Sequence, residues 1–235
     1  CRSACTCALS AGRAASGHLK SSWGTRRSAR VSHMESGSPH AKTSRDILPG
    51  TAPGAAEMDW TRWLQPGDHL VCSHMSAEPV ALLQSLAQAG LTQPLNLMLG
   101  VPFSNAAATL PGSCAITVYG GMGSAVQLAQ TRALHLSPLH YSRSARVFEQ
   151  GLWPCDVALV SLARGSDGRL HLGASHGPAL AAARRARHVI AEINAQSPCI
   201  PGAPWPADLP ITVSMEADHV LAPLRATGPT EIEQG

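Results

Sequence analysis

Short apolar runs alternate with amphipathic stretches along the chain from residue 58 onward. The apolar runs carry few charges, which is typical of strands that are buried on both faces. They cover residues 69–73, 95–101, 115–119, 157–162 and 188–193. Because helical patterns rather than tight turns separate most of these runs, the order predicts an α/β fold, with a mainly parallel sheet and helices on both faces.

The clearest helical pattern follows Pro79, a residue that suits the first turn of a helix. In residues 80–87 the apolar positions recur at helical spacing, and Gly90 is placed to end the helix. Further helices are expected over residues 125–134 and 178–187. Each of these helices connects two predicted strands, as a parallel sheet requires.

One strand pair departs from this order. Ser-Asp-Gly at residues 166–168 is a tight-turn signal shortly after the apolar run at 157–162. The RLHLG segment that follows is therefore expected to return as a short antiparallel hairpin partner.

The first 57 residues show neither a strand nor a helix period. They are rich in Ser, Gly, Ala and Arg, so they cannot bury enough apolar surface to offset the entropy lost on ordering. We expect a disordered or non-native tail over residues 1–57 and a domain over residues 58–235. A non-native origin is favoured because the chain begins with Cys1 and not Met, and a mitochondrial transit peptide is left open as the alternative.

Charge follows the same division. Residues 1–57 hold 8 Lys or Arg and 3 Asp or Glu, whereas residues 58–235 hold 10 and 12. The basic excess belongs to the tail, so the rest of the chain gives no reason to expect nucleic acid as a partner. No apolar run is long enough to cross a bilayer, and no membrane partner is expected.

The composition, 44% hydrophobic and 14% charged, suits one globular domain. The seven cysteines are odd in number and most lie in apolar segments, which favours a reducing compartment such as the cytoplasm. Neither the cysteines of the tail nor the histidine pairs of the domain have the spacing of a zinc site. No metal is therefore expected.

His74 lies where the first predicted strand ends, just before a predicted helix. In open parallel sheets, ligands bind beyond the carboxyl ends of the strands. An imidazole there can donate to, or orient, a carboxylate or thioester oxygen. Position alone more often indicates a loop histidine bonded to the backbone. The nearby Glu78 is interpreted as a partner of the helix dipole rather than as a nucleophile.

Two further stretches are candidates for polar contacts. The first is a loop between a predicted strand and a helix, made of Gly120, Gly121, Gly123 and Ser124. Backbone N–H groups there can hold a phosphate or an oxyanion, or the glycines can serve a tight turn with positive φ. The second is the pair Asn194 and Gln196, whose amides can line a polar pocket or form an Asx turn.

Residues 173–177 (Gly-Ala-Ser-His-Gly) match the G-x-S-x-G pattern of a nucleophile elbow. Asp208, Asp218 and His219 follow in the order that a triad needs. The preceding RLHL strand is short and half polar, whereas an elbow normally follows a central buried strand. A serine hydrolase using Ser175 is therefore kept only as an alternative.

Three segments, taken together, carry a resemblance. WLQPGDHLVCSHMSAEPVALLQSL enters a strand and reaches a His followed shortly by Ala-Glu-Pro. DVALVSLARGSDGRLHLGAS combines a buried strand with a D-x-x-G hairpin, and ARHVIAEINAQSPCIPG ends a strand with E-x-N-x-Q-x-P. Their order and spacing resemble the acetyl-CoA hydrolase/transferase family, which includes 4-hydroxybutyrate CoA-transferase. The similarity covers about residues 59–235.

The resemblance implies the N-terminal domain of a two-domain CoA-transferase or acyl-CoA hydrolase. In that family, a glutamate of the second domain becomes a glutamyl-CoA thioester. Neither this glutamate's motif nor the G-I-G-x-I-P loop before it occurs in the chain. We therefore expect the nucleophile to lie in a missing C-terminal domain and the isolated chain to be inactive.

The resemblance also implies partners and site residues. The expected substrates are an acyl-CoA and a short-chain carboxylate, with coenzyme A as a substrate and no permanently bound cofactor. A homodimer is left open. His74 aligns with a first-domain histidine that faces the active site, whereas Asn194 and Gln196 match a motif without an assigned role. A non-catalytic α/β module that binds a small molecule remains the non-enzymatic alternative.

Overall fold

The computed structural model describes residues 58–175 and 177–223. The predicted tail over residues 1–57 lies outside the described residues. The strands are β1 (His69–Cys72), β2 (Leu95–Gly100), β3 (Cys114–Val118), β4 (His135–Leu136), β5 (Val157–Arg164), β6 (Leu170–Leu172), β7 (His188–Asn194) and β8 (Val213–Ala217). The α-helices are α1 (Val80–Gln88), α2 (Ala125–Thr131), α3 (Ser144–Glu149) and α4 (Ala179–Ala183), and the 3₁₀ helices are η1 (Trp60–Arg62), η2 (Met75–Ala77), η3 (Ala106–Thr109) and η4 (Tyr141–Arg143).

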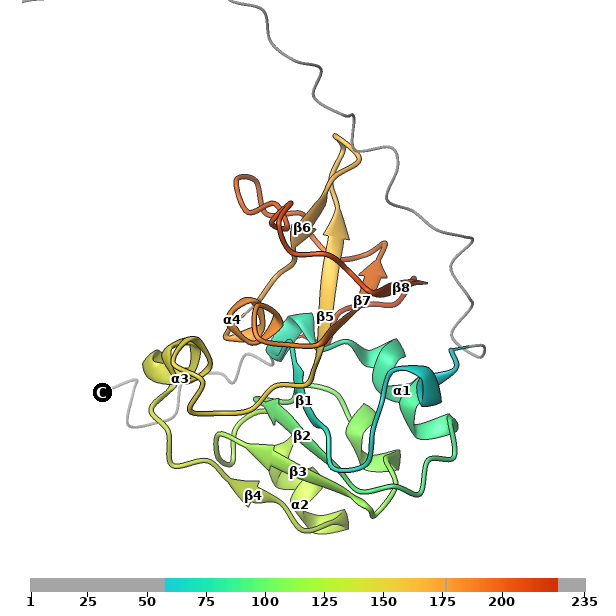
Figure 1. The fold of residues 1–235 in the computed structure, drawn as a ribbon, viewed down its shortest axis with the longest axis vertical. Coiled ribbons are helices and arrows are strands. Elements are labelled where there is room, and N and C mark those ends of the chain that lie inside the picture. Colours follow the sequence, from blue (N-terminus) through green and yellow to red (C-terminus); the bar gives the residue numbers. More distant parts are fainter. Residues whose placement is uncertain (1–57, 176, 224–235) are drawn as a thin grey trace, which may run out of the picture. The chain divides into compact units, whose positions relative to one another are not determined.

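The strands form one sheet in the order β4-β3-β2-β1-β5-β7-β8, and β6 pairs with β5 beside this path. Neighbours along the path are parallel, whereas β5 and β6 are antiparallel. The mainly parallel sheet and the hairpin predicted from the sequence are both confirmed. The strand order runs outward from β1 in one direction and from β5 in the other, so these two strands lie at the centre (Figure 1).

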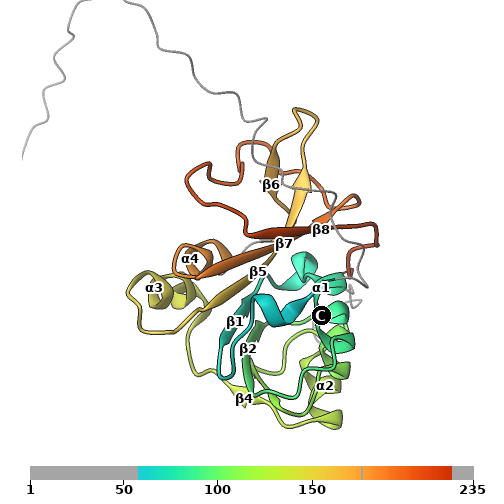
Figure 2. The same ribbon diagram turned by 45° about the vertical axis from the view of Figure 1, so that its right-hand side comes forward.

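Each central strand divides its side chains between two hydrophobic cores, one on each face of the sheet. In β5, Val157 and Leu159 belong to one core, and Ala158 and Val160 belong to the other. The first core also contains residues of α1, η3 and α2, and the second contains residues of α3 and α4. Helices therefore cover both faces, as predicted, and Figure 2 shows the two groups on opposite sides of the sheet.

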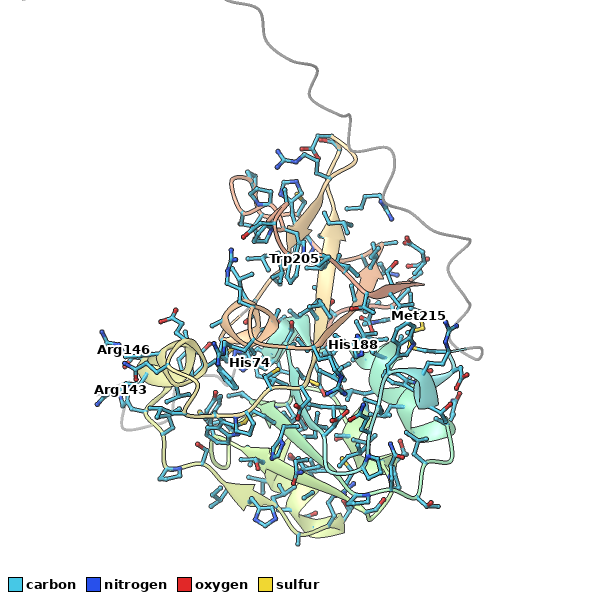
Figure 3. The ribbon with its side chains drawn as sticks, in the orientation of Figure 1. His74, Arg143, Arg146, His188, Trp205 and Met215 are labelled. Carbon is cyan, nitrogen blue, oxygen red and sulfur yellow. The ribbon has the colours of Figure 1, made fainter. Side chains whose placement is uncertain are left out.

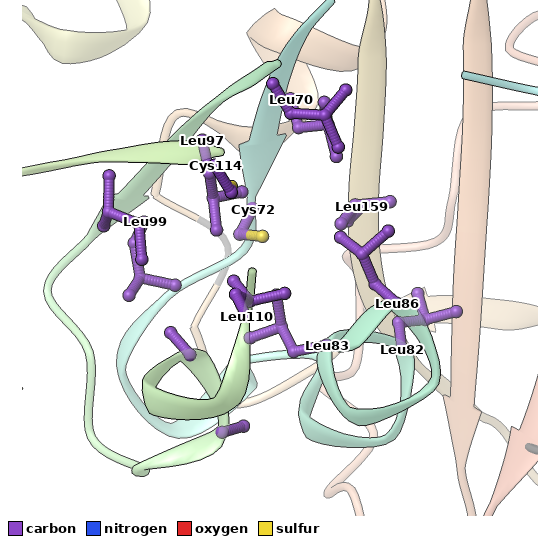
Figure 4. Close-up of a cluster of buried hydrophobic side chains, with 14 of the residues drawn as sticks. Leu70, Cys72, Leu82, Leu83, Leu86, Leu97, Leu99, Leu110, Cys114 and Leu159 are labelled. Atoms are coloured by element: carbon purple, nitrogen blue, oxygen red, sulfur yellow. The ribbon is translucent and has the colours of Figure 1, made fainter. Parts of the chain in front are cut away.

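Leucine supplies much of the first core because aromatic residues make up only 4% of the chain. Leu83 and Leu86 of α1 belong to the same cluster as Leu97 of β2 and Leu159 of β5 (Figure 4). All four side chains are at most 1% exposed. Burying a leucine side chain contributes about 1.5–3 kcal/mol, so contacts of this kind fix α1 on the sheet.

The start of α1 is bonded to the sheet as well as packed on it. The Glu192 carboxylate on β7 accepts hydrogen bonds from the backbone N–H groups of Ala81 at 2.7 Å and Leu82 at 3.2 Å. The first N–H groups of a helix have no partner within the helix, so the carboxylate satisfies two of them. Gly90, with φ of 63°, follows the C-terminal end of the helix as predicted.

The helix predicted over residues 125–134 is shorter in the structure, because α2 ends at Thr131. Arg132 has extended backbone angles, with φ of −157° and ψ of 157°. Its guanidinium donates to the carbonyl oxygens of Leu110 at 3.0 Å and Pro111 at 3.3 Å. Tertiary contacts thus end the helix before its apolar pattern ends. The helix predicted over residues 178–187 is likewise reduced to α4.

Two strands and one α-helix of the structure are absent from the prediction. Strand β4 has only two residues, both exposed, and α3 is a short helix that buries Phe148 completely. Strand β8 lies at the edge of the sheet and buries Met215 fully but leaves Glu216 exposed. None of them has an apolar run of the length on which the prediction rested.

Candidate active site

The centre of the sheet is the point from which the strand order diverges. The chain leaves β1 toward β2 on one side and leaves β5 toward β7 on the other. In open α/β sheets, the crevice beyond the carboxyl ends of two such strands is where ligands bind. His74 lies two residues beyond β1, next to this point.

His74 is almost completely buried, at 1% exposure. Its Nε2 atom lies 2.9 Å from the phenol oxygen of Tyr141, at the start of η4. The ring lies close to two glycines. A Cβ atom added to Gly100 would lie 2.6 Å from Nδ1, and one added to Gly177 would lie 2.1 Å from Nε2. Only residues without a side chain leave room for the imidazole.

The residue after His74 has an unusual backbone. Met75 has φ of 58°, the left-handed region that residues other than glycine rarely adopt. Its N–H group donates to the carbonyl oxygen of Val101 at 2.9 Å, which joins the turn after β1 to the end of β2. Such backbone strain occurs often at functional sites, and here it occurs at the residue next to His74.

Two tyrosines surround the His74 ring. Tyr119 follows β3, and its ring centroid lies 6.2 Å from that of His74 and 5.8 Å from that of Tyr141. Burial raises the pKa of Tyr119 to about 12 and also raises the pKa of Tyr141. Both phenols are therefore protonated at neutral pH. Tyr141 is 42% exposed, so it connects the buried histidine with the surface. Figure 3 shows His74 beside α3.

The glycine loop after β3 is fixed by packing on residues 102–104. Gly120 and Gly123 have positive φ values of 140° and 61°. A Cβ atom on Gly123 would lie 1.9 Å from the Pro102 carbonyl oxygen. Ser124 donates through its backbone N–H to the same oxygen and through its hydroxyl to the Ser104 carbonyl. These contacts favour the tight-turn interpretation of the loop.

Asn194 and Gln196 both hold the segment that follows β8. Asn194 is fully buried, and its amide nitrogen donates to the His219 carbonyl oxygen at 2.9 Å. Its amide oxygen accepts from the backbone N–H groups of Gln196 and His219. The Gln196 amide donates to Asp218 at 2.7 Å. The Asx turn weighed in the sequence is present, and both amides bond to the chain itself.

Glu192 was not singled out from the sequence, although it lies in the same E-x-N-x-Q motif. It is fully buried, and its Oε1 atom lies 2.8 Å from Nε2 of His219. This hydrogen bond raises the pKa of His219 above its ordinary value. A charged residue inside the apolar run HVIAEI was the available signal, because buried carboxylates are normally paired.

Glu78 is also buried, and it is held by three donors. Its carboxylate accepts from the backbone N–H groups of Phe103 and Ser104, each at 2.8 Å, and from the Ser104 hydroxyl at 2.9 Å. Burial nevertheless raises its pKa. The interpretation of Glu78 as a structural residue agrees with these contacts, although its partners are loop groups rather than the helix terminus.

The serine elbow does not assemble around Ser175. Strand β6, which precedes it, has three residues and lies beside the main path of the sheet. The Ser175 hydroxyl contacts the Met75 sulfur at 3.8 Å. Asp218 and His219 bond to Gln196 and Glu192 instead. Asp208 lies 2.9 Å from Arg184, so none of the three triad candidates is bonded to Ser175.

Within residues 58–175 and 177–223, no group of three or more His, Cys, Asp or Glu side chains could hold a metal ion. In the same residues, no helix has the length and apolar character needed to span a membrane.

Residues 117–221 match the model of the acetyl-CoA hydrolase/transferase N-terminal domain. That family is the one the sequence motifs resemble. A comparison with curated protein sequences gave no match. The hydrolase/transferase model covers β4 to β8, together with η4, Asn194 and Gln196. His74 lies outside the matched residues, so the model carries no information about it.

Solved structures have the same fold. A 4-hydroxybutyrate CoA-transferase from Porphyromonas gingivalis is 25% identical, with a TM-score of 0.52, over 74% of this chain and 41% of that one. RipA from Yersinia pestis is 19% identical, with a TM-score of 0.57, over 71% of this chain and 43% of that one. The chain therefore spans less than half the length of these proteins.

Proposed function

We propose that the chain is the N-terminal domain of an acyl-CoA:carboxylate CoA-transferase or an acyl-CoA hydrolase. The observation that carries this proposal is the match of residues 117–221 to the hydrolase/transferase domain. The structural similarity to a 4-hydroxybutyrate CoA-transferase supports it. The placement of His74 at the point where the strand order diverges agrees with a ligand site there.

The proposed reaction passes through a covalent intermediate. A glutamate of the second domain attacks the thioester carbonyl and releases the CoA thiolate, which leaves a mixed anhydride. The thiolate then attacks the glutamyl carbonyl and releases the first carboxylate, which leaves a glutamyl-CoA thioester. A second carboxylate reverses these steps in a transferase, and water cleaves the thioester in a hydrolase. Both outcomes need donors for the oxyanions that develop.

The first domain supplies positioning groups in this scheme. His74 belongs to the active-site edge and is joined to the surface through Tyr141. The glycine loop and the pair Asn194 and Gln196 shape that edge by their turns, because their polar groups are bonded to the chain. The C-terminal domain, an acyl-CoA and a short-chain carboxylate are the proposed partners.

The test compares the purified chain with a protein extended by its second domain. We expect no transfer of CoA from butyryl-CoA to acetate by the chain alone, because the scheme places the nucleophilic glutamate in the second domain. The extended protein should catalyse transfer or hydrolysis, and borohydride should inactivate it only after exposure to butyryl-CoA, since it reduces a thioester. Turnover by the chain alone would refute the proposal that the nucleophile belongs to the second domain. Saturable binding without turnover by the extended protein would favour a non-catalytic module.

A further inference from the structure

The rings of His74, Tyr119 and Tyr141 lie together beyond the end of β1. Of these three residues, only Tyr141 is exposed. His74 is 1% exposed, so its imidazole cannot touch a molecule bound at the surface. Tyr141 is 42% exposed, and its phenol oxygen is the atom bonded to His74. The Tyr141 phenol therefore joins the buried histidine to a residue that is exposed at the surface.

The hydrogen bond between His74 and Tyr141 can leave the O–H group of Tyr141 as a donor for a ligand. A phenol has one O–H proton and can also accept hydrogen bonds. When Nε2 of His74 carries a proton, the imidazole donates to the Tyr141 oxygen, and the phenol proton is free to be donated elsewhere. Burial raises the pKa of Tyr141, so that proton remains in place at neutral pH.

The neighbourhood of Tyr141 favours an anionic acceptor. Arg143 and Arg146 are both exposed, and no ion pair involves either of them within the described residues. Figure 3 shows both arginines on the side of α3 away from His74, so they add positive potential rather than a contact to the same atom. The acidic residue of α3 is Glu149, and the two arginines outnumber it.

The packing around the His74 imidazole, called the slot below, holds His74 and Tyr141 in one arrangement. Gly100 and Gly177 leave no space for the ring to turn away, and the Tyr119 ring packs on both partners. A donor held by packing costs little reorganisation when it meets a developing negative charge. The rigidity points to a donor set in advance for one position.

We propose that the Tyr141 hydroxyl donates directly to a carboxylate oxygen of a short-chain acid, and that His74 is a positioning residue which acts through it. This inference deepens the proposed function and rests on it for the identity of the acid. It assigns the substrate contact to Tyr141 rather than to His74.

The chain contains two tyrosines, so tyrosine labelled with ¹³C at Cζ gives two NMR signals, and Tyr141→Phe assigns them. Sodium butyrate should shift the Tyr141 signal in a saturable way, whereas sodium chloride and the neutral analogue butyramide should not. In Tyr141→Phe, which keeps the ring, butyrate should bind about tenfold more weakly, as expected for one lost hydrogen bond. Equal shifts with butyrate and butyramide, or no shift with butyrate, would overturn the proposal.

The positioning role has its own measurement. His74→Leu removes the donor, so the pKa of Tyr141 should rise further, and the response to butyrate should fall about tenfold. His74→Gln keeps an N–H group of similar reach and should restore both values toward those of the wild type. An unchanged or lowered pKa of Tyr141 in a folded His74→Leu protein would show that the imidazole does not donate to the phenol.

Butyryl-CoA distinguishes this inference from the proposed function. If the chain binds butyryl-CoA in equilibrium dialysis while neither butyryl-CoA nor butyrate moves the Tyr141 signal, the inference is wrong and the proposed function stands. If butyrate moves the signal and butyryl-CoA does not bind, the carboxylate contact stands and the CoA-dependent function loses its support.

Discussion

At the scale of single residues, the candidate site depends on glycine at two positions, because a side chain at either one would overlap the His74 ring. Gly100 and Gly177 both have positive φ and both border the His74 ring. Conformational freedom alone does not explain them, because a Cβ atom at either position would overlap the imidazole. The glycines and the histidine therefore form one steric unit.

Gly100→Ala tests this unit, with Gly90→Ala as the matched control. Both glycines have similar φ values, 72° and 63°, but a Cβ atom on Gly90 meets nothing within 4 Å. We expect Gly90→Ala to lower the free energy of unfolding by about 1–2 kcal/mol from backbone strain. Gly100→Ala should cost about 1–3 kcal/mol more, because the imidazole must move. Equal losses in urea unfolding would show that the slot is not tight.

The buried pair of Glu192 and His219 gives a second prediction. Glu192→Gln removes the charge that faces the imidazole and one acceptor, so we expect a loss of about 1–3 kcal/mol in urea unfolding. The control is Glu216→Gln, since Glu216 and its partner Arg164 have side chains that are 56% and 43% exposed. That exposed pair should contribute less than about 1 kcal/mol. A larger loss from the control would contradict the assignment.

The pH dependence of stability follows from the same pair. Glu192 raises the pKa of His219, so the folded state binds the proton more tightly than the unfolded state. The stabilisation is fully present below about pH 6.5, the ordinary value for histidine, and is lost as the pH rises through the raised pKa. The free energy of unfolding of the wild type minus that of His219→Asn should therefore decrease as the pH rises above about 6.5. Urea unfolding at a series of pH values measures this difference. A difference that grows would mean that the sign is wrong.

At the scale of elements, side chains from distant segments decide where helices begin and end. Glu192 on β7 bonds the first N–H groups of α1, and Arg132 bonds the loop before β3. The first of these contacts joins a helix to a strand more than a hundred residues later. Such contacts explain why patterns within each segment gave approximate boundaries.

Arg132→Met tests the contact that ends α2. The guanidinium donates to the carbonyl oxygens of residues 107, 110, 111 and 114. Leaving these acceptors without it should cost about 1–3 kcal/mol in thermal or urea unfolding. The control Arg169→Met changes an exposed residue at the tip of the hairpin and should cost less than about 0.5 kcal/mol. An Arg132→Met protein as stable as the wild type would show that water replaces the guanidinium.

At the scale of the whole described region, two cores share one sheet. Ile116 of β3 and Phe148 of α3 are both fully buried but belong to different cores. Because they lie on opposite faces of the sheet, the effects of changing them should add while the region unfolds as a unit.

Ile116→Val should cost about 0.5–1.5 kcal/mol, and Phe148→Leu about 1–3 kcal/mol. The double variant should lose the sum within about 0.5 kcal/mol, in a single urea transition. An interaction energy above about 1 kcal/mol would show coupling through the sheet. Two separate transitions would show that the cores unfold independently.

Much of the fold could be predicted because its central strands are apolar on both faces. The runs at β1, β2, β3, β5 and β7 stand out for that reason, as does the turn of the β5–β6 hairpin. The edge strand β8 could not be found in the same way, since Glu216 is exposed and Met215 is its one buried side chain. An edge strand is specified mainly by its neighbour.

The candidate site was predictable in part. His74 could be located because it follows a strand in a parallel sheet, a position that depends on local order alone. Tyr141 could not be found, because 67 residues separate it from His74 and no motif joins them. Glu192 and His219 are linked for the same kind of reason, across 27 residues.

The sequence by itself determined the α/β class, the strand-and-helix order through the central strands, and the resemblance to the hydrolase/transferase domain. These follow from local periodicity and from motifs within short segments. Only the tertiary structure decided that His74 is buried, that Tyr141 carries its contact to the surface, and that the E-x-N-x-Q motif holds the segment after β8. The reason is physical: burial and hydrogen bonding between distant residues are properties of the packed sheet, and no single segment contains them.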